Sequence, residues 1–126
     1  MKLTPVLLVD RIEDCLPFWV DKIGFEKTVE VPDGDRLGFV ILVKDRAELM
    51  LQTWESARKD APDALPRGTM GAALFIEVED FADIRRRVEG VPVLLPERVA
   101  FYGMREIGVR EPGGHFVIFA SPEPKS

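Results

Sequence analysis

Few residues of this 126-residue chain could do chemistry, since it has one histidine, His115, and one cysteine, Cys15. A single imidazole and a single thiol exclude an internal disulfide and metal sites built from several histidines or cysteines. His115 follows Gly114 in a turn-forming stretch; it could act as a lone general base, but we favour a surface histidine at a turn. Cys15 lies near a predicted helix start, which favours a thiolate, but no base accompanies it, so we interpret it as an ordinary helix residue.

The chain carries 22 acidic and 17 basic residues, which gives a net charge of −5. Proteins that bind nucleic acids normally present a basic face, so this charge argues against a nucleic-acid partner. It is compatible with a cationic small molecule, although a mildly acidic protein needs no such explanation. No apolar stretch approaches the roughly 18 residues of a membrane span, and acidic residues come too early for a signal peptide. We expect a cytoplasmic protein without a membrane partner.

Apolar spacing predicts a strand, a helix and three further strands in the first half of the chain. Residues 3–9 form an apolar run with Pro5 near its start, which fits a strand with the proline at an edge or first position. Apolar side chains then recur at spacings of three and four: Ile12, Leu16, Trp19, Val20 and Ile23. This spacing predicts a helix that ends at Gly24. Further strands are expected at 25–31, 37–43 and 48–54, with a turn at 32–35.

The second half repeats this order after a stretch, 55–70, that we interpret as a connecting loop because it has no sustained apolar period. A strand is expected at 72–78 and a helix at 81–88. A short strand at 91–95 is interrupted by Pro92 and ended by Pro96. Strands at 105–110 and 116–120 flank the turn 111–114.

The halves therefore share the order β-α-β-β-β, and they also match weakly in letters, with Val9 over Val78, for example. An internal repeat of this length indicates a fold built from two similar modules. We predict an α+β fold in a single domain, 1–126, with module 1 at about 1–55, a linker at about 56–70 and module 2 at about 71–121. Neither half covers both faces of its small sheet, so each second face must be paired or left as a wall for a ligand.

Two segments resemble the vicinal oxygen chelate superfamily, which contains glyoxalases, bleomycin resistance proteins and extradiol dioxygenases. They are PVLLVDRIEDCLPFWVDKIGFE at 5–26 and GMREIGVREPGGHFVIF at 103–119. The chain looks most like the bleomycin-resistance branch, with Glu111 where the turn usually has Asp. The resemblance implies two βαβββ modules with curved mixed sheets and helices on the convex side. It also implies a homodimer, with or without exchanged N-terminal strands, and clefts at the subunit boundary.

In metal-dependent members of the superfamily, ligands project from the first and last strands of each repeat. Carried onto this chain, those positions are Thr4, Gln52, Ala73 and Ile118. Divalent cations want several carboxylate or imidazole donors, and these side chains offer none. Shifting the register by one residue supplies no better ligand. We therefore expect no metal and no other cofactor.

The same strands place an apolar wall on the concave side by the two-residue period of a strand. Such a wall suits a flat or amphipathic organic molecule, although it could equally be dimer or inter-module core. Glu77 could pair with a cation, and the aromatic residues before the last hairpin could stack on a planar ligand. The predicted ligand-binding residues are Met50, Gln52, Trp54, Phe75, Glu77, Phe101, Tyr102, Phe116 and Ile118.

The resemblance and the missing ligands together predict a metal-independent binding protein with no catalytic residue. It would sequester a hydrophobic or cationic organic molecule in a dimer cleft, as in antibiotic resistance. The alternative is a glyoxalase-like metal-dependent lyase or dioxygenase, which would need unusual donors such as Glu48, Glu77 or Glu106. A purely structural or partner-binding dimer is the third interpretation.

Overall fold

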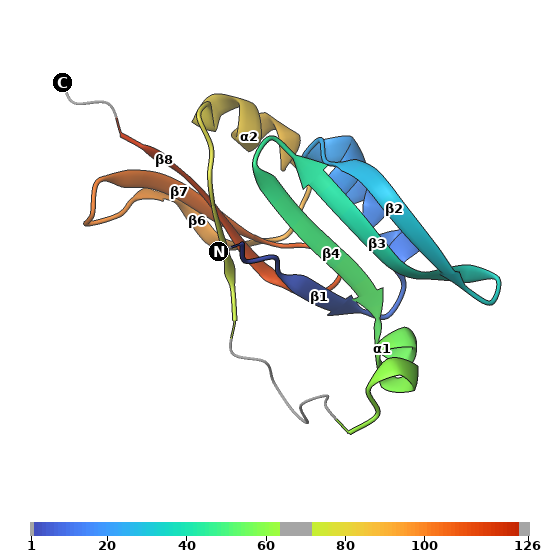
Figure 1. Ribbon diagram of the computed structural model, residues 1–126. Helices are drawn as coiled ribbons and strands as arrows, with labels where there is room; N and C mark the ends of the chain where they lie inside the picture. Colours follow the sequence, from blue (N-terminus) through green and yellow to red (C-terminus); the bar gives the residue numbers. More distant parts are fainter. Residues whose placement is uncertain (1, 64–71, 124–126) are drawn as a thin grey trace. The chain divides into compact units, whose positions relative to one another are not determined.

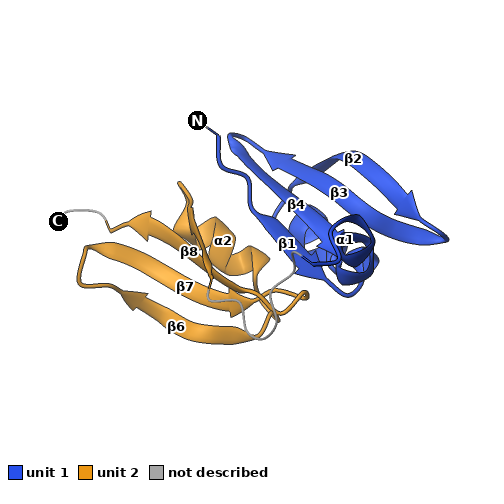
Figure 2. Ribbon diagram, turned by 60° about the horizontal axis from the view of Figure 1, so that its bottom comes forward, with its two compact units in different colours: residues 1–70 blue, residues 71–126 orange. Residues whose placement is uncertain are grey.

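The computed structural model describes residues 2–63 and 72–123. The chain divides into two compact units, residues 1–70 and 71–126, which Figure 2 shows in different colours. Each unit contains one four-stranded mixed sheet with a helical segment between its first two strands. The α+β fold of two βαβββ modules predicted from the sequence is confirmed.

The sheet of unit 1 has the strand order β1-β4-β3-β2. Strand β1 runs parallel to β4, and the other neighbours are antiparallel. The strands are β1 (Val6–Val9), β2 (Glu26–Asp33), β3 (Arg36–Lys44) and β4 (Ala47–Thr53). The helical elements are η1 (Ile12–Asp14), η2 (Pro17–Lys22) and α1 (Trp54–Asp60). In Figure 1 the helical segment between β1 and β2 lies against one face of this sheet.

The segment predicted as one regular helix consists of a 3-10 turn, η1, followed by a π-helix, η2. Pro17 has no N–H to donate at the junction, which separates the two geometries. In the wider π-turn the N–H of Ile23 donates to the oxygen of Phe18 at 3.0 Å. Gly24 follows with a positive φ of 98°, as a helix-ending glycine does. Phe18 and Trp19 are buried with their rings edge to face, so both are core residues, as expected.

The helical segment buries one face of the first sheet and leaves the other face partly exposed. Alternate residues of β3 and β4 are buried, and the residues between them are half-buried. The buried apolar residues on the covered face are Leu7, Val9, Val40, Leu42, Leu49 and Leu51, and Leu8 on the other face is buried as well. Because side chains alternate along a strand, the intervening residues share the face that the helical segment does not cover.

The loop predicted over residues 55–70 begins with a helix, α1, so that prediction is wrong for its first residues. Thr53 caps the helix, since its Oγ1 accepts a hydrogen bond from the N–H of Ser56 at 3.0 Å. Arg58 and Lys59 lie in the last turn, where cations suit the helix dipole. Trp54 is the first helical residue, so the strand alternation used to orient it does not apply. Residues 64–70 of the predicted loop lie outside the described residues.

The sheet of unit 2 repeats the topology of the first, with the order β5-β8-β7-β6 and β5 parallel to β8. Its elements are β5 (Leu74–Glu77), α2 (Phe81–Arg87), β6 (Val93–Val99), β7 (Met104–Arg110) and β8 (Phe116–Pro122). Helix α2 buries Phe81 and Ile84, and Asp80 caps it by accepting from the N–H of Asp83 at 3.1 Å. Among the described residues no helix is long and apolar enough to cross a bilayer.

The prediction that Pro96 ends a short strand at 91–95 is wrong. The strand begins at Val93 and runs through Pro96 to Val99. It lies at the edge of the sheet, where a residue without an N–H can be accommodated. The pairing with β7 is irregular between Leu95 and Arg98, on either side of the proline.

Candidate functional site

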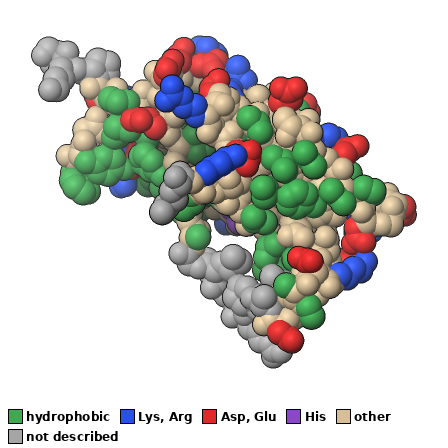
Figure 3. All heavy atoms as spheres, in the orientation of Figure 1, with side chains coloured by type: hydrophobic (Ala, Val, Ile, Leu, Met, Phe, Trp, Pro, Cys, Tyr) green, Lys and Arg blue, Asp and Glu red, His purple; other side chains and the backbone are tan. Residues whose placement is uncertain are grey.

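The uncovered face of the first sheet is apolar over most of its area. Met50 lies between Val6 and Ile41 on the neighbouring strands, and Gln52 lies between Leu8 and Phe39. Met50 and Gln52, both predicted from the sequence, therefore share one face. Figure 3 shows hydrophobic side chains gathered over β3 and β4. Such a surface can bind an organic molecule through apolar contact.

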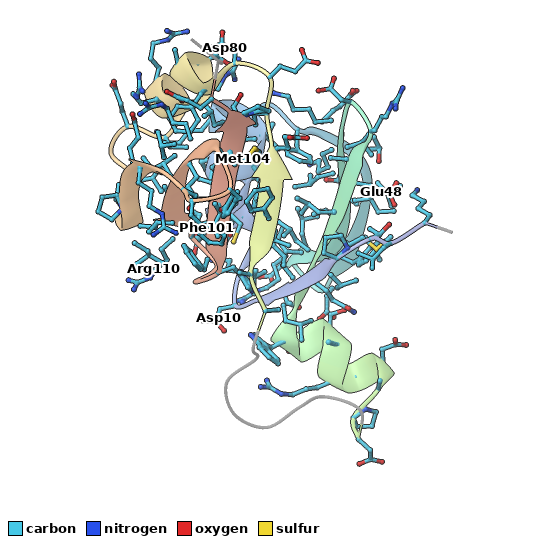
Figure 4. The ribbon with its side chains drawn as sticks, turned by 90° about the vertical axis from the view of Figure 1, so that its left-hand side faces the viewer. Asp10, Glu48, Asp80, Phe101, Met104 and Arg110 are labelled. Carbon is cyan, nitrogen blue, oxygen red and sulfur yellow. The ribbon has the colours of Figure 1, made fainter. Side chains whose placement is uncertain are left out.

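One end of this face carries a polar cluster around Glu48, which Figure 4 labels on β4. Lys2 Nζ donates to Glu48 Oε2 at 3.0 Å, and Thr4 Oγ1 donates to Oε1 at 3.2 Å. The bond from Lys2 holds the pKa of the Glu48 carboxyl below its usual value. The negative charge of Glu48 is thus already balanced by Lys2 within the unit.

The positions that the resemblance assigns to metal ligands offer no carboxylate or imidazole donor. Thr4 is bound to Glu48, and Gln52 Nε2 donates to Ser56 Oγ at 3.3 Å. Ala73 and Ile118 have no donor atom in their side chains. Within residues 2–63 and 72–123, no three His, Cys, Asp or Glu side chains gather as ligands would. These residues do not fit a divalent cation, which wants several carboxylate or imidazole donors.

The face of the second sheet opposite α2 carries an apolar row. Phe75 of β5 lies beside Ile118 of β8, and Ile118 lies beside Gly108 of β7. A Cβ on Gly108 would come within 2.5 Å of Phe116 Cε1, so the missing side chain makes room for the ring. Phe75 remains 53% exposed. Phe75, Phe116 and Ile118 therefore share one surface, which an aromatic or aliphatic group could contact.

A second, charged row crosses the same face. Glu77, Ala120, Glu106 and Arg98 lie side by side on four strands. Glu106 is only 1% exposed, yet Arg98 Nε donates to its Oε1 at 2.8 Å and the Tyr102 hydroxyl donates to its Oε2. The hydrogen bond from Tyr102, together with the bond from Arg98, holds the pKa of the Glu106 carboxyl below its ordinary value. The same hydrogen bond raises the pKa of Tyr102.

The connection between β6 and β7 presents two aromatic rings that the sequence placed in the site. Phe101 is fully exposed and Tyr102 is half exposed, with their ring centroids 5.1 Å apart. Figure 4 labels Phe101 beside Met104, the first residue of β7. Tyr102 reaches the buried Glu106, whereas the Phe101 ring packs edge to face against the ring of Tyr102.

Sequence reasoning missed the partner of His115, which is Glu111 across the β7–β8 turn. Glu111 is 1% exposed; its Oε1 accepts a bond from the His115 N–H at 2.8 Å and also pairs with ring Nδ1. Burial alone would raise the pKa of the Glu111 carboxyl, but the bonds from His115 outweigh it and the pKa is lowered. The sequence does contain a signal for this pair, because Glu111, which stands where related proteins usually have Asp, lies four positions before His115.

The remaining predicted residue, Trp54, lies in unit 1 at the start of α1, where Arg58 stacks over its ring at 5.6 Å. Apart from Phe101, which is exposed in the β6–β7 connection, the other predicted residues fall into two groups. Met50 and Gln52 lie on the open face of the first sheet. Phe75, Glu77, Tyr102, Phe116 and Ile118 lie on or beside the open face of the second.

Comparison with known proteins identifies the fold. No protein-family model matches the chain, and no curated protein matches it in sequence. A solved glyoxalase/bleomycin resistance protein/dioxygenase from Nocardioides aligns with 100% of this chain and 86% of its own, with 16% identity and a TM-score of 0.73. Lactoylglutathione lyase from Agrobacterium tumefaciens aligns over 96% of this chain and 92% of its own, with 22% identity and a TM-score of 0.73.

A third solved structure is the bleomycin-binding protein of bleomycin-producing Streptomyces verticillus, complexed with copper(II)-bleomycin. It is 26% identical, covers 98% of this chain and 97% of its own, and has a TM-score of 0.64. The resemblance predicted from residues 5–26 and 103–119 is thereby confirmed at the level of the fold.

Proposed function

We propose that this chain, which has the fold of the glyoxalase/bleomycin resistance/dioxygenase proteins, binds a small organic molecule without a metal ion. The observation that carries the proposal is the pair of sheet faces that the helical segments leave open and that present apolar side chains, while the positions where a metal-dependent relative would have ligands offer no carboxylate or imidazole. Met50 on the first sheet and Phe75 with Ile118 on the second supply contact area. The ligand would be hydrophobic or cationic, in keeping with the net charge of −5.

The likeness to a bleomycin-binding protein supports a role in sequestering a ligand rather than in converting it. Sequestration needs affinity alone, and an antibiotic held in this way is kept from its target. A metal-dependent lyase or dioxygenase would need carboxylate donors that are free to bind a cation. Glu48 and Glu106 are instead committed to Lys2 and Arg98. Glu77 alone does not supply the several donors that a divalent cation binds. Binding is therefore the better supported function.

We also propose that the protein is a cytoplasmic homodimer. Each sheet is covered by its own helical segment on one face only, and a second copy is one way to enclose the other face around a ligand. Light scattering on the purified protein measures this directly. A monomer at all accessible concentrations would remove the dimer from the proposal.

The absence of a functional metal is tested by elemental analysis and thermal-shift titration of the purified protein. We expect no stoichiometric Ni, Zn, Mn or Fe, and no gain in melting temperature when these ions are added. A stoichiometric ion together with a matching gain in stability would refute metal independence and favour the enzyme.

Ligand binding is tested with indole as a neutral aromatic probe and with bleomycin as a large cationic one. Phe75→Ser should weaken probe binding to the second sheet. Val93→Ser is the matched control, since Val93 is equally exposed, at 51%, but pairs with Val109 on the side of α2. Equal weakening by both variants, or no binding of either probe, would contradict the proposal.

A further inference from the structure

The open face of the second sheet presents opposite charges at the two ends of one row. Glu77 on β5 and Arg98 on β6 end a row that runs through Ala120 and Glu106. Directly opposed residues in a sheet share a face, so these side chains project from the same surface. Neighbouring strands are about 4.8 Å apart, which puts the backbones of the end residues roughly 14 Å apart.

Arg98 is held so that part of its guanidinium remains available. Its Nε donates to the buried Glu106, while the side chain is 56% exposed. Its two terminal nitrogens have no hydrogen-bond partner in the part of the chain that the structure describes. A guanidinium anchored through Nε still offers two NH2 groups, which suit a carboxylate.

Glu77 is exposed and, within the described residues, makes no hydrogen bond or ion pair. Phe75 lies two residues earlier on the same strand and face, with its ring half exposed. A free carboxylate next to an exposed ring can bind an ammonium group through charge and through the face of the ring. This end of the row is therefore suited to a cation.

We propose that this face binds a zwitterion, with its cation on Glu77, its anion on Arg98 and its apolar body over Phe75 and Ile118. The inference rests on the proposed function, since it names the class of ligand that the open face takes. Arg98 reaches inward to Glu106, so the ligand's charges should lie about two strand spacings, or roughly 10 Å, apart. A free α-amino acid is too short for this span. An extended tripeptide, at roughly 3.4 Å per residue, matches it.

The probe is the tripeptide Gly-Phe-Gly, compared with its N-acetylated, C-amidated and doubly capped forms. Each is titrated into the protein while the backbone amide signals of β5, β7 and β8 are followed by NMR. Capping either end should weaken binding roughly two- to tenfold, because each cap removes one charge contact. The doubly capped form should bind weakest.

Variants assign each charge to its residue. Glu77→Gln should abolish the preference for a free amine and leave the preference for a free carboxylate. Arg98→Met should do the reverse, and Arg98→Lys, which keeps the charge but loses the paired donors, should fall between. Arg86→Met is the control, since Arg86 lies on α2 and should change neither preference.

The outcomes separate this inference from the proposed function. If indole and all four peptides shift the same amides, and the peptides bind equally well, the charged row plays no part and only the inference fails. It also fails if phenylalanine binds as tightly as the tripeptide, because the spacing would then be wrong. If neither indole nor any peptide shifts these amides at about 10 mM, the proposed binding function fails with it.

Discussion

Replacing Gly108 by alanine tests how the apolar row of the second sheet is packed. A Cβ at this position would come within 2.5 Å of Phe116 Cε1 and 2.8 Å of Leu95 Cβ. Carbon atoms in contact prefer separations of about 3.5–4.0 Å, so the Phe116 ring and the β6 backbone must both move. The substitution should therefore destabilise unit 2 although alanine suits a strand better than glycine does.

The size of the effect follows from two opposing terms. Overpacking a well-filled site costs about 1–3 kcal/mol. Removing the extra backbone freedom of glycine returns about 0.5–1 kcal/mol. The expected net loss in the free energy of unfolding for Gly108→Ala is centred on about 1 kcal/mol.

The loss is measured by urea unfolding of the parent, Gly108→Ala, Phe116→Ala and the double variant. Since most of the clash is with the ring, Gly108→Ala should cost less when Phe116 is already alanine, with a coupling of about 0.5 kcal/mol or more. A Gly108→Ala protein as stable as the parent would show that the ring does not occupy the space above Gly108. Equal losses in both backgrounds would show that the ring is not the obstacle.

Three further predictions concern polar groups. Thr53→Ala should cost about 1 kcal/mol of stability in urea unfolding because α1 loses its cap, whereas Thr28→Ala on an exposed edge should cost little. Glu111 has a lowered pKa, so its contribution is present above the ordinary value of 4.5 and is lost as the pH falls below it. Glu111→Gln should therefore lose less stability between pH 7 and pH 3 than the parent does, and an equal loss would contradict this account. Glu106→Gln should lower the pKa of Tyr102 in a spectrophotometric titration, and an unchanged titration would show that the carboxylate does not act on the phenol.

The fold was predictable because the hydrophobic pattern is consistent with the topology at nearly every strand. The two-residue period placed Met50 and Gln52 on one face of β4, and the turn at Gly114, with its positive φ of 91°, occurs where the glycine predicted it. The errors have physical causes. Pro17 changes the helix type without interrupting its apolar spacing, and Pro96 is accommodated because β6 is an edge strand.

The candidate site was predictable only in part. Side chains alternate between the two faces of a strand, so the sequence alone could place Phe75, Glu77 and Ile118 on the same face of the sheet. The bonds of Arg98 and Tyr102 to Glu106 depend on the pairing of β6 with β7. That pairing is irregular, so its register could not be predicted from the sequence. Trp54 was misplaced because the cap at Thr53 ends the strand one residue earlier than the apolar run suggested.

The parallel pairing of β1 with β4 has a consequence for how the chain reaches its native state. It joins Val6 to Met50, residues separated by most of the length of the unit, whereas β2, β3 and β4 are linked by tight turns. Local hairpins form faster than distant contacts, so β1 should be the last strand to pair during folding and the first to separate during unfolding. On the ribosome, β1 has no place to dock until Thr53 has emerged. During that interval its apolar residues are exposed to chaperones and to the same strand of another nascent chain.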